Sequence, residues 1–215
     1  MEEKTEDKME LIKRVEALKK TRVKGLVDIR LKEFRQLGGA CVEEVFKELS
    51  FCMLTANFSA ERAMKIQEDV GDGFLDLPEK RLAKKLRELG HRYPNARAKF
   101  IAESRKHRDS LKGTLSSFKD QKELREWLVR NVKGLGYKEA SHFLRNIGFY
   151  DLAIIDFHIV DVLEKHGMIE RPKTMTKRKY MEVENVLRGI AKKAGMSLAE
   201  LDLYLWYMET GKILK

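Results

Sequence analysis

The stretch KGLGYKEASHFLR, Lys133–Arg145, governs the interpretation of the rest of the chain. It places Gly134 and Gly136 on either side of one leucine, with a lysine two residues later at Lys138. Apolar residues at helical spacing stand before and after this turn, so the stretch predicts two helices joined by a tight connection. Glycine adopts dihedral angles closed to other residues, and its missing side chain lets the backbone approach another molecule.

The pattern hydrophobic–x–Gly–hydrophobic–Gly between two predicted helices is typical of a helix-hairpin-helix element, here at 121–148. The second helix of such an element offers free N–H groups and the positive end of its dipole, which suit a phosphate. A contact of this kind grips the DNA backbone and reads no base. The alternative is an ordinary helix–glycine–helix turn, and we favour DNA contact by Gly134 and Gly136.

The charge of the chain supports a polyanionic partner. Its 215 residues include 44 lysines and arginines against 34 acidic residues, a formal net charge of +10. Such a surplus favours nucleic acid before membrane, although a well-solvated basic surface is the alternative. A hydrophobic content of 43% excludes a disordered chain. No apolar signal core and no 18-residue apolar span occur in the sequence, so we expect a cytoplasmic protein without a membrane partner.

Helical periodicity dominates the sequence, and it predicts an all-α fold. We expect a single domain over 1–215, a two-lobed helical bundle with an interlobe cleft. The approximate lobes are 45–150 and 1–44 plus 151–215. Helices are expected at 11–18, 23–37, 42–57, 60–68, 78 onward, 95–105, 121–132, 138–147, 157–166, 180–193 and 197–210.

The cysteines and histidines do not suggest a metal site. Cys41 and Cys52 lie in apolar contexts without a CxxC pattern, so both are expected to be buried free thiols. His142 and His158 have no metal-ligand partner at suitable spacing and are expected to be structural. No metal site is therefore predicted.

Lys138 has two interpretations. It is either one more phosphate contact or a nucleophile, because an amine near a cation-rich helix N-terminus loses its proton more easily and can then form a Schiff base. The later stretch IIDFHI contains a possible acidic partner, Asp156. Asp156 is also explained as the N-cap of a helix, and an acid in that role can still present a carboxylate to a substrate.

The sequence GLGYKEA followed by IIDFHI resembles the helix-hairpin-helix DNA glycosylases of the endonuclease III superfamily. That superfamily places Gly-x-Gly-x-Lys ahead of a Val-Asp-type acid, and its lysine marks the bifunctional glycosylase/lyases. The resemblance implies that Lys138 and Asp156 are catalytic. The superfamily's four-cysteine iron–sulfur cluster is absent here.

A narrower resemblance extends over nearly the whole chain. The segments LTANFSAERA, RYPNARAKFI and LWYMETGKILK are similar to those of the archaeal-type, second-family 8-oxoguanine DNA glycosylases. This resemblance implies a base-excision repair enzyme acting on double-stranded DNA that contains 8-oxoguanine. In the implied reaction Lys138 displaces the damaged base through a Schiff base, and β-elimination then cleaves the strand 3′ to the site. No cofactor takes part, and a monomer is assumed.

The resemblance also implies residues that recognise the base. Trp206 lies beside the apolar stripe Leu198, Leu201, Leu205 and Met208, and is either a core residue or the aromatic that stacks on the flipped base. Tyr93 is the candidate for the opposite face of the base, or a packing aromatic at a turn. Lys215, as the last residue, is expected to bind the oxidised guanine through its main-chain carboxylate, with a frayed tail as the alternative.

Asn57 and Phe58 lie where the superfamily carries the residue that fills the gap left by a flipped base. The alternatives are that Asn57 caps the following helix and that Phe58 packs inside. Two other functions remain open from the sequence. One is a glycosylase for another damaged or mismatched base, and the other is a non-catalytic helix-hairpin-helix module that only holds DNA.

Overall fold

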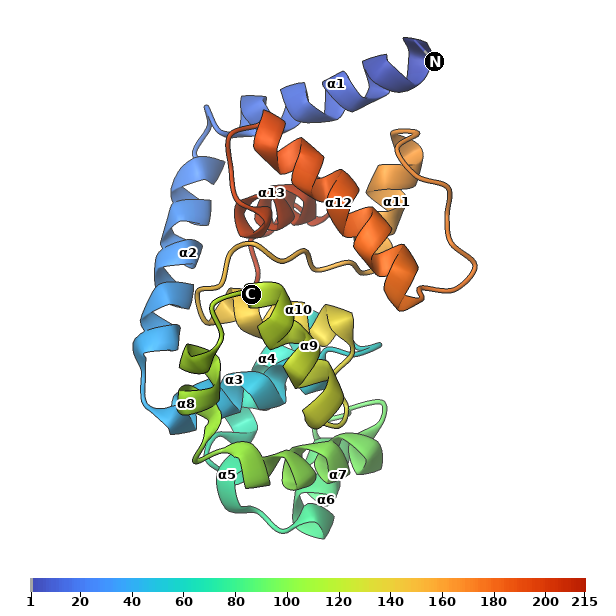
Figure 1. Ribbon diagram of the computed structural model, residues 1–215. Coiled ribbons are helices and arrows are strands. Elements are labelled where there is room, and N and C mark those ends of the chain that lie inside the picture. Colours follow the sequence, from blue (N-terminus) through green and yellow to red (C-terminus); the bar gives the residue numbers. More distant parts are fainter. Residues whose placement is uncertain (1) are drawn as a thin grey trace. The chain divides into compact units, whose positions relative to one another are not determined.

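The computed structural model describes residues 2–215, with side chains from Met9 onward (Figure 1). Within residues 2–215 there are thirteen α-helices, one 3₁₀ helix and no β-strand, which confirms the all-α prediction. The elements are α1 (Glu2–Leu18), α2 (Val23–Gly39), α3 (Val42–Leu54), α4 (Ala60–Val70), α5 (Gly73–Asp76), α6 (Glu79–Glu88), α7 (Pro94–Ser104), η1 (Arg105–His107), α8 (Leu111–Ser117), α9 (Gln121–Asn131), α10 (Tyr137–Asn146), α11 (Phe157–Lys165), α12 (Lys177–Lys193) and α13 (Leu198–Thr210).

The chain divides into two compact units. The terminal unit consists of Met1–Phe34 together with Gly148–Lys215, and the hairpin unit consists of Arg35–Ile147. Helix α2 crosses the boundary between them in the sequence. The lobes expected from the sequence, 45–150 and 1–44 plus 151–215, stay a proposal.

In the terminal unit, α13 packs against α1, α11 and α12. Three members of the apolar stripe expected on α13 are buried, but Met208 is only half-buried. Leu203 and Tyr204 are buried as well, so the buried arc of the helix is wider than the predicted stripe. A helix with several packing partners needs apolar residues on more than one side.

In the hairpin unit, α3 packs against α4, α5, α7, α8 and α10. Every residue from Glu48 to Leu54 is buried, which places this helix at the centre of the unit. The helix ends at Leu54, three residues before the predicted end at Asn57. Asn57 has a positive φ of 55°, which is incompatible with a continuing right-handed helix.

Residues typical of helix N-termini predicted the starts of two helices correctly. Pro94 is the first residue of α7, and Ser197 and Glu200 form the expected capping box at the start of α13. Helix α12 begins at Lys177, earlier than predicted, because the Thr176 side chain accepts a hydrogen bond from the Lys179 N–H. The short helices α5 and α8 were not expected from the sequence.

The two cysteines differ in exposure. Cys52 is buried within α3 as predicted, but Cys41 is exposed, so the prediction for Cys41 is wrong. Cys41 is the N-cap residue of α3 and therefore precedes the first helical turn that packs into the core.

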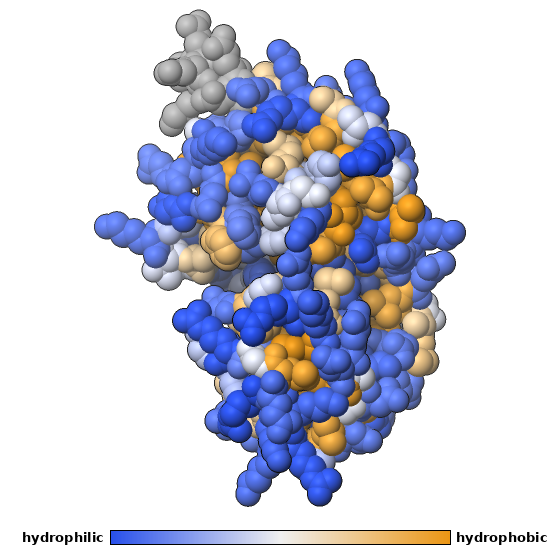
Figure 2. Space-filling model, turned by 180° about the vertical axis from the view of Figure 1, so that it is seen from behind, coloured by the Kyte–Doolittle hydropathy of each residue, from blue (hydrophilic) through white to orange (hydrophobic). Residues whose placement is uncertain are grey.

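One face of the protein is mostly hydrophilic (Figure 2). Figure 2 shows this face, on which blue hydrophilic side chains predominate and orange apolar patches are smaller. No helix in the described part of the chain is both long enough and apolar enough to cross a membrane.

Candidate functional site

The hairpin between α9 and α10 has the geometry that its glycines predict. Gly134 has φ of 93°, a conformation that residues with a side chain rarely adopt. A Cβ atom on Gly134 would lie 2.6 Å from Cδ2 of Phe100, so the position also has no space for a methyl group. Val132 and Leu135 are both buried on either side of Gly134, which anchors the hairpin in the core. The helix-hairpin-helix element is therefore confirmed.

Glu139 closes the start of α10. Its Oε2 accepts a hydrogen bond from the Gly136 N–H at 3.2 Å. Its Oε1 lies 3.6 Å from Nζ of Lys138, so the same carboxylate forms an ion pair with the candidate nucleophile. The carboxylate at this helix start is also favoured by the helix dipole.

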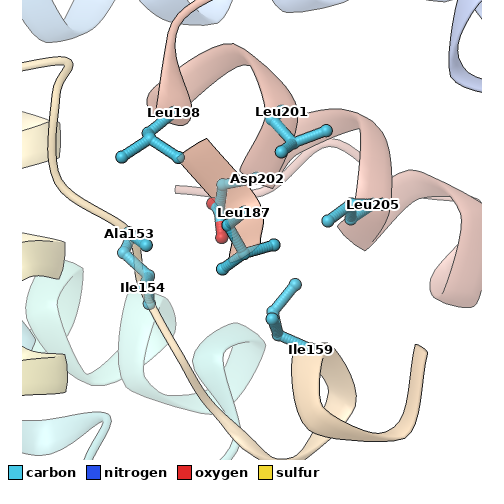
Figure 3. Close-up of a pocket in the computed structure, with 8 residues that line it drawn as sticks. All are labelled: Ala153, Ile154, Ile159, Leu187, Leu198, Leu201, Asp202 and Leu205. Carbon is cyan, nitrogen blue, oxygen red and sulfur yellow. The ribbon is translucent and has the colours of Figure 1, made fainter. Parts of the chain in front are cut away.

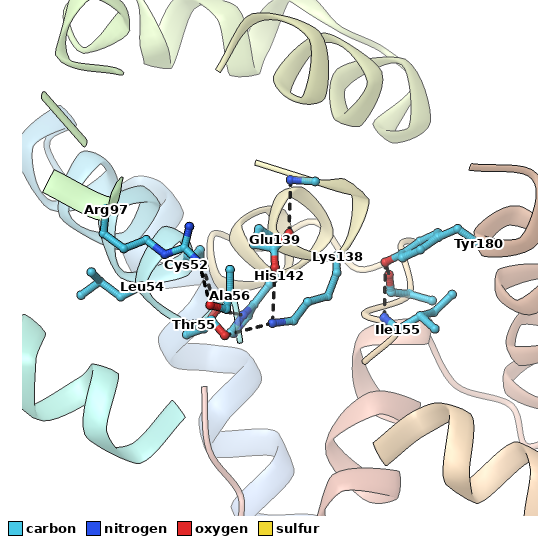
Figure 4. Close-up of polar contacts among 12 residues, drawn as sticks. Cys52, Leu54, Thr55, Ala56, Arg97, Lys138, Glu139, His142, Ile155 and Tyr180 are labelled. Atoms are coloured by element: carbon cyan, nitrogen blue, oxygen red, sulfur yellow. Dashed lines mark hydrogen bonds and ion pairs between the residues drawn. The ribbon is translucent and has the colours of Figure 1, made fainter. Parts of the chain in front are cut away.

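Lys138 points back across the hairpin unit toward the end of α3. Its Nζ donates a hydrogen bond to the carbonyl oxygen of Thr55 at 3.4 Å, as Figure 4 shows. The side chain retains 23% of its exposure. The lysine therefore has a defined direction and remains accessible to solvent.

Three consecutive carbonyl groups at the end of α3 each contact a basic side chain. The Leu54 carbonyl contacts Nε2 of His91 at 3.0 Å, and the Thr55 carbonyl accepts from Lys138. The Ala56 carbonyl accepts from Nη2 of Arg97 at 2.7 Å (Figure 4). The last carbonyls of a helix have no intrahelical partner and carry partial negative charge, so basic side chains suit them.

The hydrogen bonds of His91 define its protonation state. Nδ1 accepts from the Tyr93 main-chain N–H at 3.1 Å, so the proton lies on Nε2, which donates to Leu54. Burial lowers the pKa of His91 from its ordinary value of 6.5, and the charges of Arg97 and Arg62 lower it further. The Leu54 contact opposes this shift. His91 is thus a neutral imidazole that connects the end of α3 to Tyr93.

The loop after α3 exposes one of its two gap-filling candidates. Asn57 is exposed and is the one non-glycine residue with positive φ in the described chain. Phe58 is half-buried, with its ring 4.2 Å from the His91 ring and the Arg62 guanidinium 5.0 Å from its centroid. The cap of the following helix is Ser59, whose Oγ accepts from Arg62 N. The alternative role of Asn57 as that cap is therefore wrong.

Tyr93 is partly exposed beside two arginines. It retains 38% of its exposure, and the guanidinium groups of Arg92 and Arg97 lie 5.1 and 5.8 Å from its ring centroid. Burial lowers the pKa of the Arg97 guanidinium, and the carboxylate of Glu139 opposes this effect. The Tyr93 ring is thus partly available for stacking.

Asp156 is the N-cap of α11 in the terminal unit. Its Oδ1 accepts a hydrogen bond from the Ile159 N–H at 3.0 Å, so the capping role predicted from the sequence is confirmed. A carboxylate has two oxygens and several lone pairs, and one cap bond leaves Oδ2 available for another task.

Trp206 lies on α13, also in the terminal unit. Its indole packs edge-to-face against the His158 ring at a centroid distance of 5.0 Å. The indole N–H is buried and donates to no acceptor among residues 9–215. A buried donor without an acceptor costs free energy. His158 therefore has a packing role beside a candidate stacking residue.

The end of the chain follows α13 after Gly211, which has φ of 70°. The carbonyl of Ile213 accepts from Nη2 of Arg30 at 3.4 Å, and Lys215 is half-buried. The contact with Arg30 ties the last residues to α2. The role expected for the Lys215 carboxylate stays a prediction.

A small cavity of the terminal unit is almost entirely apolar. Figure 3 shows Asp202 among leucine, isoleucine and alanine side chains from α11, α12, α13 and the segment before α11. Among the described residues, no group of three or more histidine, cysteine, aspartate or glutamate side chains could hold a metal ion. His142 lies with Nδ1 3.5 Å from Oγ1 of Thr55, consistent with a structural role.

The sequence did not single out His91 or Arg97 as functional. Each contacts a main-chain carbonyl more than thirty residues away in sequence, at Leu54 and Ala56. The segment RYPNARAKFI contains Arg97 but gives no local sign of that contact. An isolated histidine beside a turn, such as His91, gives even less.

Comparisons with known proteins agree with this architecture. A profile of the family described as 8-oxoguanine DNA glycosylase matches residues 27–196. The 8-oxoguanine DNA glycosylase/AP lyase of Korarchaeum cryptofilum is 54% identical over 207 residues, covering 96% of this chain and 98% of the relative.

Two solved structures are also similar. The Methanocaldococcus jannaschii 8-oxoguanine glycosylase/lyase, in complex with a 15mer DNA containing 8-oxoguanine, is 50% identical with a TM-score of 0.93, covering 95% of this chain and 99% of that one. The 8-oxoguanine DNA glycosylase of Thermotoga maritima is 48% identical with a TM-score of 0.91, covering 97% and 100%. The profile match and these identities over almost the whole length place this chain in the helix-hairpin-helix 8-oxoguanine DNA glycosylase family.

Proposed function

We propose that this protein removes 8-oxoguanine from double-stranded DNA and then cleaves the strand 3′ to the site. The observation that carries this proposal is Lys138, held at the N-terminus of the hairpin's second helix with a directed and accessible amine. Family membership and the names of the similar proteins support both activities, glycosylase and lyase. The DNA-bound structure of the Methanocaldococcus jannaschii relative supports DNA as the partner.

In the proposed reaction the target nucleotide leaves the stack, because its glycosidic carbon is inaccessible inside a duplex. The neutral amine of Lys138 attacks C1′ and forms a C–N bond, while the C1′–N9 bond breaks and its electrons leave with the base. The new C–N bond leaves Nζ with a positive charge, and the Glu139 carboxylate at 3.6 Å is placed to accept the proton that Nζ then loses. The departing base anion takes up a proton from solvent. Sugar ring opening then gives the imine, loss of the 2′ proton follows, and elimination breaks the C3′–O bond.

Asp156 has two roles in the proposal. Its carboxylate stabilises the positive charge that develops on the sugar as the base departs, and it assists proton transfer. The cap bond to Ile159 orients the carboxylate by fixing the position of Oδ1. Oδ2 is the oxygen assigned to the sugar.

The remaining residues are assigned to binding. Gly134 and Gly136 bring the hairpin backbone to a DNA phosphate, which the start of α10 favours electrostatically. Tyr93 and Trp206 stack on the flipped base, and the Lys215 carboxylate contacts the guanine edge. Asn57 fills the gap in the duplex, where an inserted side chain offsets part of the unstacking cost.

Borohydride trapping tests the reaction and the substrate together. Duplexes with one 8-oxoguanine, with one thymine glycol and without damage are incubated with the protein and borohydride, which reduces an imine to a permanent adduct. We expect an adduct on the 8-oxoguanine strand alone, and we expect Lys138→Gln to lose it. Lys84→Gln is the control, because Lys84 is also paired with a glutamate, Glu88, but lies on the exposed face of α6.

Each alternative predicts a different result. Trapping on the thymine glycol duplex instead would keep the lysine chemistry and overturn the substrate. No adduct on any strand, from folded protein that still binds DNA, would leave Lys138 as a phosphate contact. In that case Lys138→Gln should weaken binding, with a salt dependence lower by about one phosphate contact.

A further inference from the structure

The chain between α10 and α11 reaches Asp156 through the segment Asp151–Ile155, which belongs to no helix. Leu152, Ala153, Ile154 and Ile155 are all buried. Main-chain N–H and C=O groups buried outside a helix or sheet must find other partners. The position of Asp156 therefore depends on the groups that hold this segment.

Helix α12 supplies those partners from a single stripe of side chains. The Tyr180 hydroxyl accepts from the Ile155 N–H at 3.3 Å (Figure 4). The same hydroxyl donates to the Ala153 carbonyl at 2.7 Å. Oε2 of Glu184 accepts from the Ala153 N–H at 3.1 Å. The two side chains thus bind both main-chain groups of Ala153.

Arg188 completes the stripe. Its Nη2 donates to the Asp151 carbonyl at 3.0 Å, and its Nη1 pairs with the Asp151 carboxylate. Residues four apart lie on one face of a helix, so Tyr180, Glu184 and Arg188 face the segment together. Side chains of one helix thus supply hydrogen-bond partners to main-chain groups of a segment that forms no helix or sheet of its own.

Because the contacts of Tyr180 and Glu184 are buried, the loss of any one of them would cost free energy. Tyr180 is 2% exposed and Glu184 is 1% exposed. A buried carboxylate needs a compensating charge, and Nη2 of Arg188 lies 3.5 Å from Oε1 of Glu184. Removing one partner would leave a buried main-chain group without its hydrogen bond, so the segment would shift to find another.

The apolar side of the segment is also fixed by neighbouring helices. Figure 3 shows Ala153 and Ile154 beside Leu187 of α12 and the leucines of α13. Tyr180 contacts Ile155, the residue before Asp156. On the other side, the Asp156 side chain accepts the cap bond from the Ile159 N–H, three residues later. Asp156 is thus held from both sides along the chain.

We propose that Tyr180, with Glu184 and Arg188 beside it, is a positioning residue for Asp156. This inference rests on the proposed function, because it assigns the three side chains a role in placing the carboxylate at the reacting sugar. Tyr180 contacts no reacting atom and acts through the Ile155 main chain. A misplacement of about 1 Å can slow an enzyme by about 10²-fold. Contacts that fix the position of Asp156 can therefore affect the reaction rate without contacting the substrate.

The substitution Tyr180→Phe removes only the hydroxyl group. We expect single-turnover excision of 8-oxoguanine to slow by about tenfold to a hundredfold, while the dissociation constant for the same duplex stays within about twofold. Tyr150→Phe is the matched control. The Tyr150 hydroxyl also donates to a main-chain carbonyl in the terminal unit, that of Leu31 at 2.6 Å, which lies in α2 and not in the segment before Asp156.

A double-mutant cycle with Asp156→Asn identifies the route of the effect. If Tyr180 acts through Asp156, Tyr180→Phe has no further effect on the residual excision rate of Asp156→Asn. Amide hydrogen exchange of 152–159 should be faster in Tyr180→Phe and unchanged in Tyr150→Phe. This exchange measurement also covers the case in which Asp156→Asn has no measurable rate.

Three results would overturn the inference. They are equal excision rates for Tyr180→Phe and Tyr150→Phe, an undiminished slowing in the Asp156→Asn background, and unchanged exchange of 152–159. Failure of the proposed function looks different, because the wild-type protein itself would then fail to excise 8-oxoguanine.

Discussion

Backbone conformation and side-chain function can be separated at Asn57. Its φ of 55° is tolerated by asparagine and glycine more easily than by alanine. Asn57→Ala should therefore lower the free energy of unfolding by about 1 kcal/mol, whereas Asn57→Gly should change it by less than about 0.5 kcal/mol. Denaturant unfolding of both variants measures this difference.

The same two variants test the gap-filling role of Asn57. Both lack the side chain, so both should excise 8-oxoguanine about tenfold more slowly, a loss of about 1.4 kcal/mol in transition-state stabilisation. The glycine variant is decisive because its fold is unaffected. Excision at the wild-type rate by Asn57→Gly would show that another residue fills the gap.

His91 makes the stability of the protein depend on pH. Burial, followed by the charges of Arg97 and Arg62, holds the pKa of His91 below 6.5 in the folded state. As pH falls through 6.5, the unfolded chain takes up a proton first, so stability present above this pH is progressively lost down to the folded pKa. The protonated ring would also turn Nδ1 into a donor facing the Tyr93 N–H.

Denaturant unfolding at pH 7.5 and pH 5 measures this contribution. We expect the free energy of unfolding to fall more between these pH values in the wild type than in His91→Gln. The glutamine can still donate to Leu54 but has no group that protonates in this range. Both proteins contain the same carboxylates, so the effect of these groups cancels when the two losses of unfolding free energy are subtracted. An equal loss in both proteins would assign the pH dependence to groups other than His91.

Among the structural elements, the hairpin has the strictest local requirement. Gly134→Ala would place a methyl group 2.6 Å from Phe100 at a φ of 93°, and should cost about 2 kcal/mol of stability. Gly113→Ala in α8 is the matched control, because nothing lies within 4 Å of its Cβ position. Alanine is the better helix former, so that control should gain about 0.5 to 1 kcal/mol. Thermal unfolding of the two variants should move in opposite directions.

Local rules predicted the elements whose signals are local. The glycine hairpin, the capping box at Ser197 and the capping aspartate Asp156 each depend on residues within one turn, and the structure confirms all three. Helix α8 was missed because LKGTLSS contains glycine, serine and threonine and buries only Leu111. A helix with one buried residue has no apolar period to detect.

The partners of the candidate site residues could not be predicted in this way. Lys138 contacts the Thr55 carbonyl across 83 positions of the sequence, and Tyr180 contacts a segment 25 to 27 residues earlier. Main-chain carbonyls have the same chemistry at every residue, so the sequence does not mark the ones that are used. Glu184 gave a faint signal, as one acid within the apolar spacing of α12.

At the scale of the whole molecule, the residues assigned to the reaction come from both units. Tyr93 and Lys138 belong to the hairpin unit, whereas Asp156 and Trp206 belong to the terminal unit. The sequence identified these residues through local motifs and family resemblance. The net charge of +10 adds a property that no single motif contains, a general attraction to polyanions.

The α12 stripe has a second consequence, for the behaviour of the protein under heat. Leu152–Ile155 is a run of four apolar residues outside any helix, the kind of segment that pairs with copies of itself in cross-β aggregates. Because α12 occupies main-chain groups of Ala153 and Ile155, the folded chain offers no template there. Detachment of this one helix would uncover that template while other helices persisted. Thermal inactivation should therefore become irreversible once α12 separates, and the side chains proposed to position Asp156 would also set the lifetime of the protein in storage.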